Sequence, residues 1–118
     1  MKKILTKRVY EAAADSDGYR ILIDRIWPRG VGKKEAHLDD WIKEVAPTDK
    51  LRKWFAHDPK KFDGFEEKYR NELKDKSEIL EKIRNKATDK TVTLLYGAKD
   101  TEHNQAIVLQ KVLMEGGC

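Results

Sequence analysis

Three short blocks of apolar and β-branched residues interrupt an otherwise highly charged chain, at residues 4–10, 19–26 and 91–96. The centre of the second block, ILI at residues 21–23, is apolar without alternation. Such a run is typical of a strand that is covered on both faces of its sheet. The third block, TVTLLY, has the same character. We therefore predict three strands of a buried sheet.

Between and after these strands, apolar residues recur at intervals of three and four, the spacing of amphipathic helices. The first such group lies within residues 38–46 and favours a helix that ends before Pro47, because proline disfavours the helical conformation in the preceding residue. A strand over the same residues is the alternative. Four more helices are predicted: one capped by Thr48 or Asp49, one starting at Asp58-Pro59, one starting near Ser77, and one over residues 102–114.

The predicted helix after Pro59 carries a stripe of large apolar residues, Phe62, Phe65, Tyr69 and Leu73. Their spacing places them on one helical face, so we interpret them as core and not as a cofactor site. Strands that alternate with helices indicate an α/β fold: a small three-layer domain with a mostly parallel sheet flanked by helices.

The chain length of 118 residues suits a single α/β domain over residues 1–118, with mobile ends at 1–3 and 115–118. Charged residues make up 39% of the chain and the net charge is +4, which leans weakly towards anionic partners. Charges of both signs are mixed along the helical segments, as on a solvated surface.

Several classes of protein are disfavoured by the composition. No apolar run approaches the ~20 residues that span a bilayer, and no signal peptide is recognisable behind MKKILTKRVY. The single cysteine, Cys118, is the last residue, so we expect neither a disulfide framework, nor a structural zinc site, nor a thiol nucleophile. We predict a cytoplasmic protein that does not enter a membrane and needs no cofactor and no metal.

The heptapeptide DRIWPRG, at residues 24–30, follows the second strand and is the first candidate site. A guanidinium is a planar fork of donors that stays charged, so Arg25 and Arg29 together would bind a phosphate or carboxylate well. Asp24 could orient one of them, and Trp27 could form the floor of a pocket. In the alternative reading Asp24 and Arg25 pair with neighbours to close the strand, and Trp27 belongs to the core.

The loop after the third strand, YGAKDTEHN, is the second candidate site. It precedes a predicted helix N-terminus, where free backbone amides favour an anion. Asn104 is the candidate anion ligand, Tyr96 and Asp100 are candidate pocket-lining residues, and His103 could move a proton near neutral pH. Alternatively, Asp100 is an ordinary helix cap and His103 a surface residue. If both strands are parallel neighbours, the two loops share one edge of the sheet.

A third candidate is His57-Asp58, in which a histidine and an acid stand side by side as a possible acid–base pair. Asp58 also has a structural role available, as the cap of the helix that begins at Pro59. Glycine-rich phosphate loops, GxSxG and HExxH are absent from the sequence.

Several stretches together resemble the YeaO-like branch of a bacterial family catalogued as a domain of unknown function. They are KRVY, DGYRILIDRIWPRGV, LDDWIKEVAP, LRKWFAHDP, F…KYRNEL and VTLLYGAKDTEHNQAIVL, in this order from Lys7 to about Leu113. The resemblance implies a small cytoplasmic α/β protein, with no activity attached to the family as a whole. The broader family often carries Cys-His-Arg after the last strand. The corresponding residues here are Asn104, Gln105 and Ala106, which removes the thiol and an arginine and makes a thiol mechanism doubtful.

Three hypotheses follow. The first is an anion pocket at the carboxyl edge of the sheet, with Arg25, Arg29 and Asn104 as ligands of a small anion. Its enzyme version is a hydrolase or transferase of a phosphorylated or carboxylated metabolite, with His103, His57 and Asp58 as catalytic candidates. The alternatives are a nucleic-acid-binding module and a partner-binding protein without catalysis.

Overall fold

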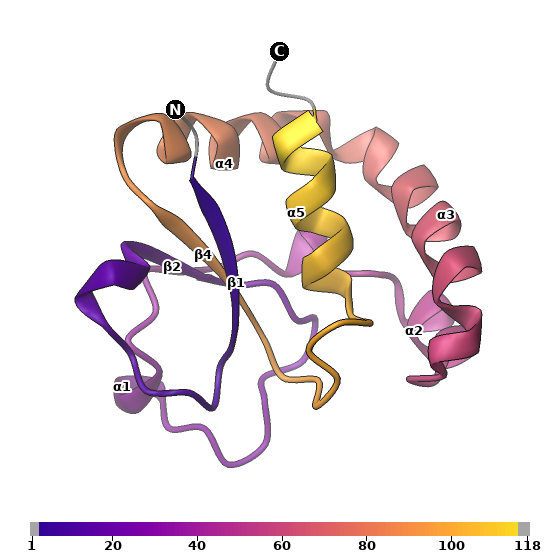
Figure 1. Ribbon diagram of the computed structural model, residues 1–118, viewed down its shortest axis with the longest axis horizontal. Helices are drawn as coiled ribbons and strands as arrows, with labels where there is room; N and C mark the ends of the chain where they lie inside the picture. Colours follow the sequence, from indigo (N-terminus) through magenta and orange to yellow (C-terminus); the bar gives the residue numbers. More distant parts are fainter. Residues whose placement is uncertain (1–2, 116–118) are drawn as a thin grey trace.

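The computed structural model describes residues 3–115 (Figure 1). Within these residues, four strands form one parallel sheet of order β1-β4-β2-β3. Its strands are β1 (Ile4–Arg8), β2 (Tyr19–Leu22), β3 (Asp40–Trp41) and β4 (Val92–Tyr96). Strand β4 lies in the middle and pairs with both β1 and β2. The three predicted strands and the parallel arrangement are confirmed.

Helices follow the strands and cover the sheet, so the predicted α/β class is also confirmed. The α-helices are α1 (Lys33–Ala36), α2 (Asp49–Phe55), α3 (Phe62–Leu73), α4 (Ser77–Asp89) and α5 (Gln105–Glu115). Short 3₁₀ turns lie in the connections: η1 (Asp15–Asp17) between β1 and β2, η2 (Lys43–Val45) before α2, and η3 (Pro59–Lys61) and η4 (Lys74–Lys76) on either side of α3.

Two of the predicted caps are in place. The Oγ1 atom of Thr48 accepts a hydrogen bond of 3.2 Å from the Leu51 N–H at the start of α2. A carboxylate oxygen of Asp58 accepts one of 3.0 Å from the Lys60 N–H, and Pro59 takes the first position of η3. The predicted final helix begins three residues later than expected, because the backbone N–H groups of Glu102 and His103 bond to Asp100 in a turn instead.

The main core lies between one face of the sheet and helices α2 to α5. Alternate residues of the strands face it, among them Ile21, Ile23, Leu94 and Tyr96. The predicted stripe of α3 packs here: Phe65, Tyr69 and Leu73 are buried, and Phe62 is partly buried. Leu22 and Leu95 face the opposite side of the sheet, where they meet Val9, Trp27, Val31, Leu38 and Trp41. Both faces of the central strands are therefore covered, as their apolar sequence predicted.

The helix predicted within residues 38–46 is wrong, and the alternative strand is correct only in part: β3 covers Asp40–Trp41, and Lys43–Val45 form the turn η2. The Asp39 N–H donates to the Arg20 carbonyl (2.9 Å) and the Ile42 N–H to the Leu22 carbonyl (3.0 Å), so this segment extends the sheet as edge strand β3. Leu38 and Trp41 join the smaller core, whereas Ile42 and Val45 belong to the main one. These four residues therefore pack on both faces of the sheet, which the single apolar face of an amphipathic helix could not do.

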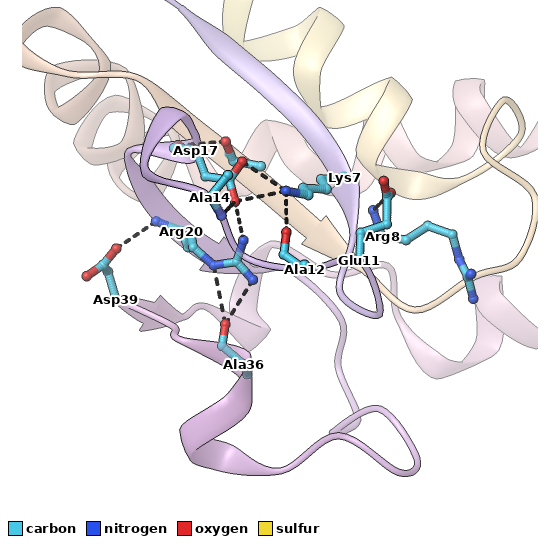
Figure 2. A network of polar contacts seen from close by, with 10 residues as sticks. Lys7, Arg8, Glu11, Ala12, Ala14, Asp17, Arg20, Ala36 and Asp39 are labelled. Carbon is cyan, nitrogen blue, oxygen red and sulfur yellow. Dashed lines mark hydrogen bonds and ion pairs between the residues drawn. The ribbon is translucent and has the colours of Figure 1, made fainter.

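The sheet face opposite α4 and α5 also holds a buried polar network (Figure 2). Arg20 is 4% exposed and its guanidinium donates to a carboxylate oxygen of Asp17 and to the Ala36 carbonyl. Lys7 lies 3.1 Å from the same carboxylate, and the Ala14 N–H donates to it as well. The hydrogen bonds and ion pairs of this network connect β1, η1, β2 and α1, and each of its charged groups has a partner within residues 3–115.

The ends that the sequence analysis expected to be mobile lie only partly within the described residues. Residues 1–2 and 116–118, including Cys118, fall outside them. The carbonyl of Lys3 accepts a hydrogen bond of 3.0 Å from the Val92 N–H, and Glu115 is the last residue of α5, where it pairs with Arg70 on α3. Lys3 and Glu115 are therefore held by neighbouring elements.

Candidate functional site

The loops that follow β2 and β4 meet at the carboxyl edge of the sheet, because the two strands are adjacent and parallel (Figure 1). Asp24 makes the contact. One of its oxygens accepts a hydrogen bond of 2.9 Å from the Gly97 N–H, and the other accepts one from the Gln105 side-chain amide. A Cβ on Gly97 would lie 2.9 Å from that first oxygen, so a larger residue here would displace the Asp24 carboxylate from its hydrogen bond.

A cleft of about 560 Å³ opens at this edge, between the two loops, the end of α2 and α3. Its volume is in the range of small-molecule sites in proteins. Its polar lining residues are Tyr10, Asp24, Arg25, Arg29, Arg52, His57, Asn104 and Gln105. The others are Ile26, Trp27, Pro28, Ala46, Pro47, Phe55, Phe65, Gly97 and Ala98.

Three arginines from two parts of the chain line the cleft. Arg25 is fixed by hydrogen bonds from Nε to the Pro47 carbonyl (3.0 Å) and from Nη2 to the Ala46 carbonyl (3.3 Å). Arg52 pairs with the exposed Asp49 at 2.6 Å. Within residues 3–115, the guanidinium of Arg29 has no hydrogen-bond or ion-pair partner, while its carbonyl accepts a bond from the Tyr10 hydroxyl. All three arginines are exposed, so their charges lie at the mouth of the cleft.

Asp24 is the acidic group that lines the cleft. Burial raises its pKa to about 6, and the hydrogen bonds from Gly97 and Gln105 offset that effect only in part. It therefore titrates close to neutral pH, unlike an ordinary aspartate. Asp24 was predicted to orient Arg25 or Arg29, but its observed partners are Gly97, in the loop after β4, and Gln105, at the start of α5.

The raised pKa of Asp24 makes a prediction about stability. The native state holds this proton more tightly than the unfolded chain between about pH 4 and pH 6, so the folded protein loses stability as the pH rises through that window. In Asp24→Asn this loss is absent. We therefore compare the free energy of unfolding of the variant with that of the wild type at each pH. The difference, variant minus wild type, should be about 2–3 kcal/mol larger at pH 7.5 than at pH 4. Urea unfolding at several pH values measures the difference, and parallel pH profiles of the two proteins would contradict the assignment.

His57 reaches the cleft through an unusual backbone turn at the end of α2. Ala56 and His57 both have positive φ angles, 47° and 57°. Residues other than glycine rarely adopt this conformation. The His57 ring lies 6.3 Å from the ring of Phe55, which is itself a buried lining residue. Its neighbour Asp58 caps η3 and does not line the cleft.

The second candidate loop contributes less to the cleft than the sequence suggested. The Nδ1 atom of His103 lies 3.0 Å from Asp100, and its ring packs edge-on against Phe62, so neither His103 nor Asp100 lines the cleft. The Glu102 N–H, together with His103, holds the pKa of Asp100 below its ordinary value. Tyr96 faces the main core, and burial raises its pKa. The structure thus places the predicted residues of this loop around the start of α5.

Asn104 and Trp27 line the cleft but also have structural partners. The buried Asn104 side chain donates to the Asp100 carbonyl (2.8 Å) and accepts from the Ile107 N–H (3.2 Å), which caps α5. The Trp27 indole N–H donates to the Val31 carbonyl (2.7 Å), and its ring packs edge-on against Trp41. Both readings that the sequence left open for Trp27, pocket floor and core, therefore describe part of its role.

Arg52 and Gln105 are lining residues that sequence reasoning did not single out. Arg52 stands in a short charged helix, LRKWF, where it resembles any solvated residue. It reaches the cleft because α2 ends beside the loop after β2, which is a tertiary feature. Gln105 was noted only as a departure from the broader family, and its contact with Asp24 could not be read from the chain.

The described part of the chain offers neither a cluster of metal-binding side chains nor a membrane-spanning helix. No cluster of three His, Cys, Asp or Glu side chains suitable for a metal ion was found among residues 3–115. Within the same residues no helix has the length and apolar character needed to cross a membrane.

The fold and the cleft define a small α/β domain with an arginine-rimmed pocket at the carboxyl edge of a parallel sheet. Over residues 3–116 the chain matches the family described as the inactive DUF488-N3 subclade, and it belongs to this family. It is 44% identical over 106 residues to the uncharacterized protein YeaO of Escherichia coli K12, which covers 90% of this chain and 92% of that protein. The predicted resemblance to the YeaO-like branch is confirmed.

Uncharacterized proteins of Mycobacterium bovis and Mycobacterium tuberculosis are also similar. Each is 36% identical over 111 residues, which covers 94% of this chain and 93% of each relative. No solved structure matches the fold of this chain.

Proposed function

We propose that this protein is a cytoplasmic binding protein for a small anion, a phosphate or a carboxylate, and that the anion occupies the mouth of the cleft. The observation that carries the proposal is the convergence of Arg25, Arg29 and Arg52 on one cleft. Guanidinium groups bind carboxylates and phosphates in bidentate fashion. Arg52 already pairs with Asp49, so Arg25 and Arg29 against the one lining carboxylate, Asp24, leave a surplus of positive charge.

Two further features support an anion at this place. Helix α5 begins at Gln105 on the wall of the cleft, and the positive end of a helix dipole favours negative charge. Arg25 is held in place by two backbone carbonyls, so binding does not have to immobilise its whole side chain.

Binding without turnover is favoured over a hydrolase or transferase. The family is described as an inactive subclade. Of the three residues nominated for catalysis, His103 and Asp58 lie outside the cleft lining, and His57 alone lines it. Asn104 and Gln105, which stand where the broader family often has cysteine and histidine, cap α5 and hold Asp24.

The proposal predicts that Arg29→Ala weakens anion binding by about 10-fold or more, since a charge-assisted hydrogen bond contributes about 1.5–3 kcal/mol. Isothermal titration with inorganic phosphate, succinate and a short oligonucleotide measures the affinities. Lys60→Ala removes an exposed charge that does not line the cleft and serves as the matched control.

The oligonucleotide separates the proposal from nucleic-acid binding. A binder of many phosphates loses affinity steeply with salt, whereas a cleft that engages one anion shows a shallow salt dependence. The proposal would be contradicted if only the oligonucleotide bound tightly, if its affinity fell steeply with salt, and if Arg29→Ala and Lys60→Ala reduced that affinity equally.

A further inference from the structure

We infer that the ligand is an amphipathic acid: a planar, largely apolar molecule with its anionic group at one end and a hydrogen-bond donor at the other. Its anionic group lies among the arginines at the mouth, and its donor reaches Asp24. This inference rests on the proposed function, and it adds the chemical class of the ligand.

The charged and the apolar lining residues of the cleft differ in their exposure. The arginine side chains that line the cleft are all exposed. The buried lining residues are mostly uncharged and apolar: Pro28, Ala46, Pro47, Phe55 and Phe65. A ligand that fills the cleft therefore meets positive charge at its outer end and apolar surface along its length.

The apolar part of the cleft lining consists largely of aromatic and proline rings. The rings of Phe55 and Phe65 stack with centroids 4.5 Å apart, and both side chains are at most 5% exposed. The half-buried Trp27 and the buried Pro28 and Pro47 also line the cleft. Aromatic and proline rings offer flat surfaces, which favour a planar ligand over a branched or spherical one. The exposed Ile26 extends the apolar surface to the mouth.

Asp24 is the acid within the cleft lining. Each of its oxygens accepts one hydrogen bond, from Gly97 or from Gln105. A carboxylate offers about four acceptor sites, so each oxygen can accept one more hydrogen bond. A compact anion pushed towards this carboxylate would be repelled. A hydroxyl or amino group on the inner end of the ligand satisfies it instead.

The test uses acetate, benzoate and 4-hydroxybenzoate, titrated into the wild-type protein at pH 7.5 by calorimetry. Benzoate should bind at least 10-fold more tightly than acetate, because its ring buries apolar surface. The hydroxyl should add about 3- to 10-fold. Inorganic phosphate and phenyl phosphate repeat the comparison for a phosphate head group.

Two variants and a control assign these preferences to the cleft. In Asp24→Asn the gain from the hydroxyl should shrink, because one uncharged amide oxygen replaces the two acceptors of the carboxylate, whereas the exposed Glu67→Gln, outside the cleft, should retain it in full. In Ile26→Ser, an exposed position that tolerates a polar residue, the preference for benzoate over acetate should fall about 3-fold.

The outcomes separate the inference from the proposed function. Suppose that acetate and phosphate bind as tightly as benzoate and phenyl phosphate, and that Arg29→Ala weakens the binding of all four. This result would overturn the inference but would leave the proposed function standing. A hydroxyl gain that is undiminished in Asp24→Asn would also overturn the inference. If none of these anions binds the wild-type protein, the proposed function itself fails.

Discussion

Replacing Arg20 by methionine should lower the free energy of unfolding by about 3–5 kcal/mol, the range found when one partner of a buried ion pair is removed. Arg20 is 4% exposed, and its guanidinium bonds to Asp17 and to the Ala36 carbonyl (Figure 2). Methionine fills much of the same volume, but it leaves a buried carboxylate with one cation and a buried carbonyl without its donors.

Lys7→Met is the matched control, because it also removes one cation from Asp17. Lys7 is more exposed than Arg20, with a side-chain exposure of 19% against 5%. Its loss should cost about 1 kcal/mol. Urea unfolding at pH 7 measures both variants, and equal losses would contradict the view that burial gives Arg20 its larger effect.

The same network should make the protein sensitive to acid. Burial by itself would raise the pKa of Asp17, but the Ala14 N–H and the cations of Lys7 and Arg20 bring it below its ordinary value of 3.8. A carboxyl whose pKa is lowered on folding contributes stability above its unfolded pKa, and this contribution is lost as the pH falls below about 4. The effect of Arg20→Met should shrink over that range.

Substituting alanine for Gly18 should destabilise the protein by about 3–5 kcal/mol, the sum of backbone strain and overpacking. Gly18 has φ 67° and ψ −128°, a combination that residues with a Cβ avoid. The added Cβ would lie 2.2 Å from the Thr91 carbonyl oxygen. That oxygen cannot retreat easily, because it accepts the Tyr19 N–H at 2.8 Å where β2 begins.

Gly30→Ala separates the two contributions. Gly30 also has a positive φ, 78°, but a Cβ there would meet no atom within 4 Å. Only the backbone strain applies, about 1–2 kcal/mol. Comparable losses at Gly18 and Gly30 would mean that the Thr91 carbonyl moves aside, in contradiction to the rigid pairing of β2 with its neighbours.

Much of the fold could be predicted from the sequence because local signals and tertiary packing agree. The runs ILI and TVTLLY indicated strands covered on both faces, and each does place side chains in two clusters. Thr48 and Asp58 are strong capping residues and are followed by helical turns where expected. The segment at residues 38–46 misled because Leu38, Trp41, Ile42 and Val45 have helical spacing, although they belong to two cores on opposite faces of the sheet.

The sequence could predict those parts of the candidate site that depend only on the order and direction of the strands. Two polar loops after adjacent parallel strands had to share an edge, so Asp24, Arg25, Arg29 and Asn104 were found from the chain. Arg52 and Phe55 come from a helix whose position depends on packing against α3. His103 lies outside the cleft lining, and the sequence could not show this, because it does not reveal that the His103 ring packs against Phe62.

An NMR titration of the ¹⁵N-labelled protein with benzoate at pH 6 tests most directly whether the cleft binds an anion through its arginines. The account predicts shifts of the Nε–Hε signals of Arg25 and Arg29 and of the Gly97 amide, with the amides of α4 unchanged. Shifts spread evenly over surface lysines, with the two arginine signals unmoved up to saturating benzoate, would contradict it.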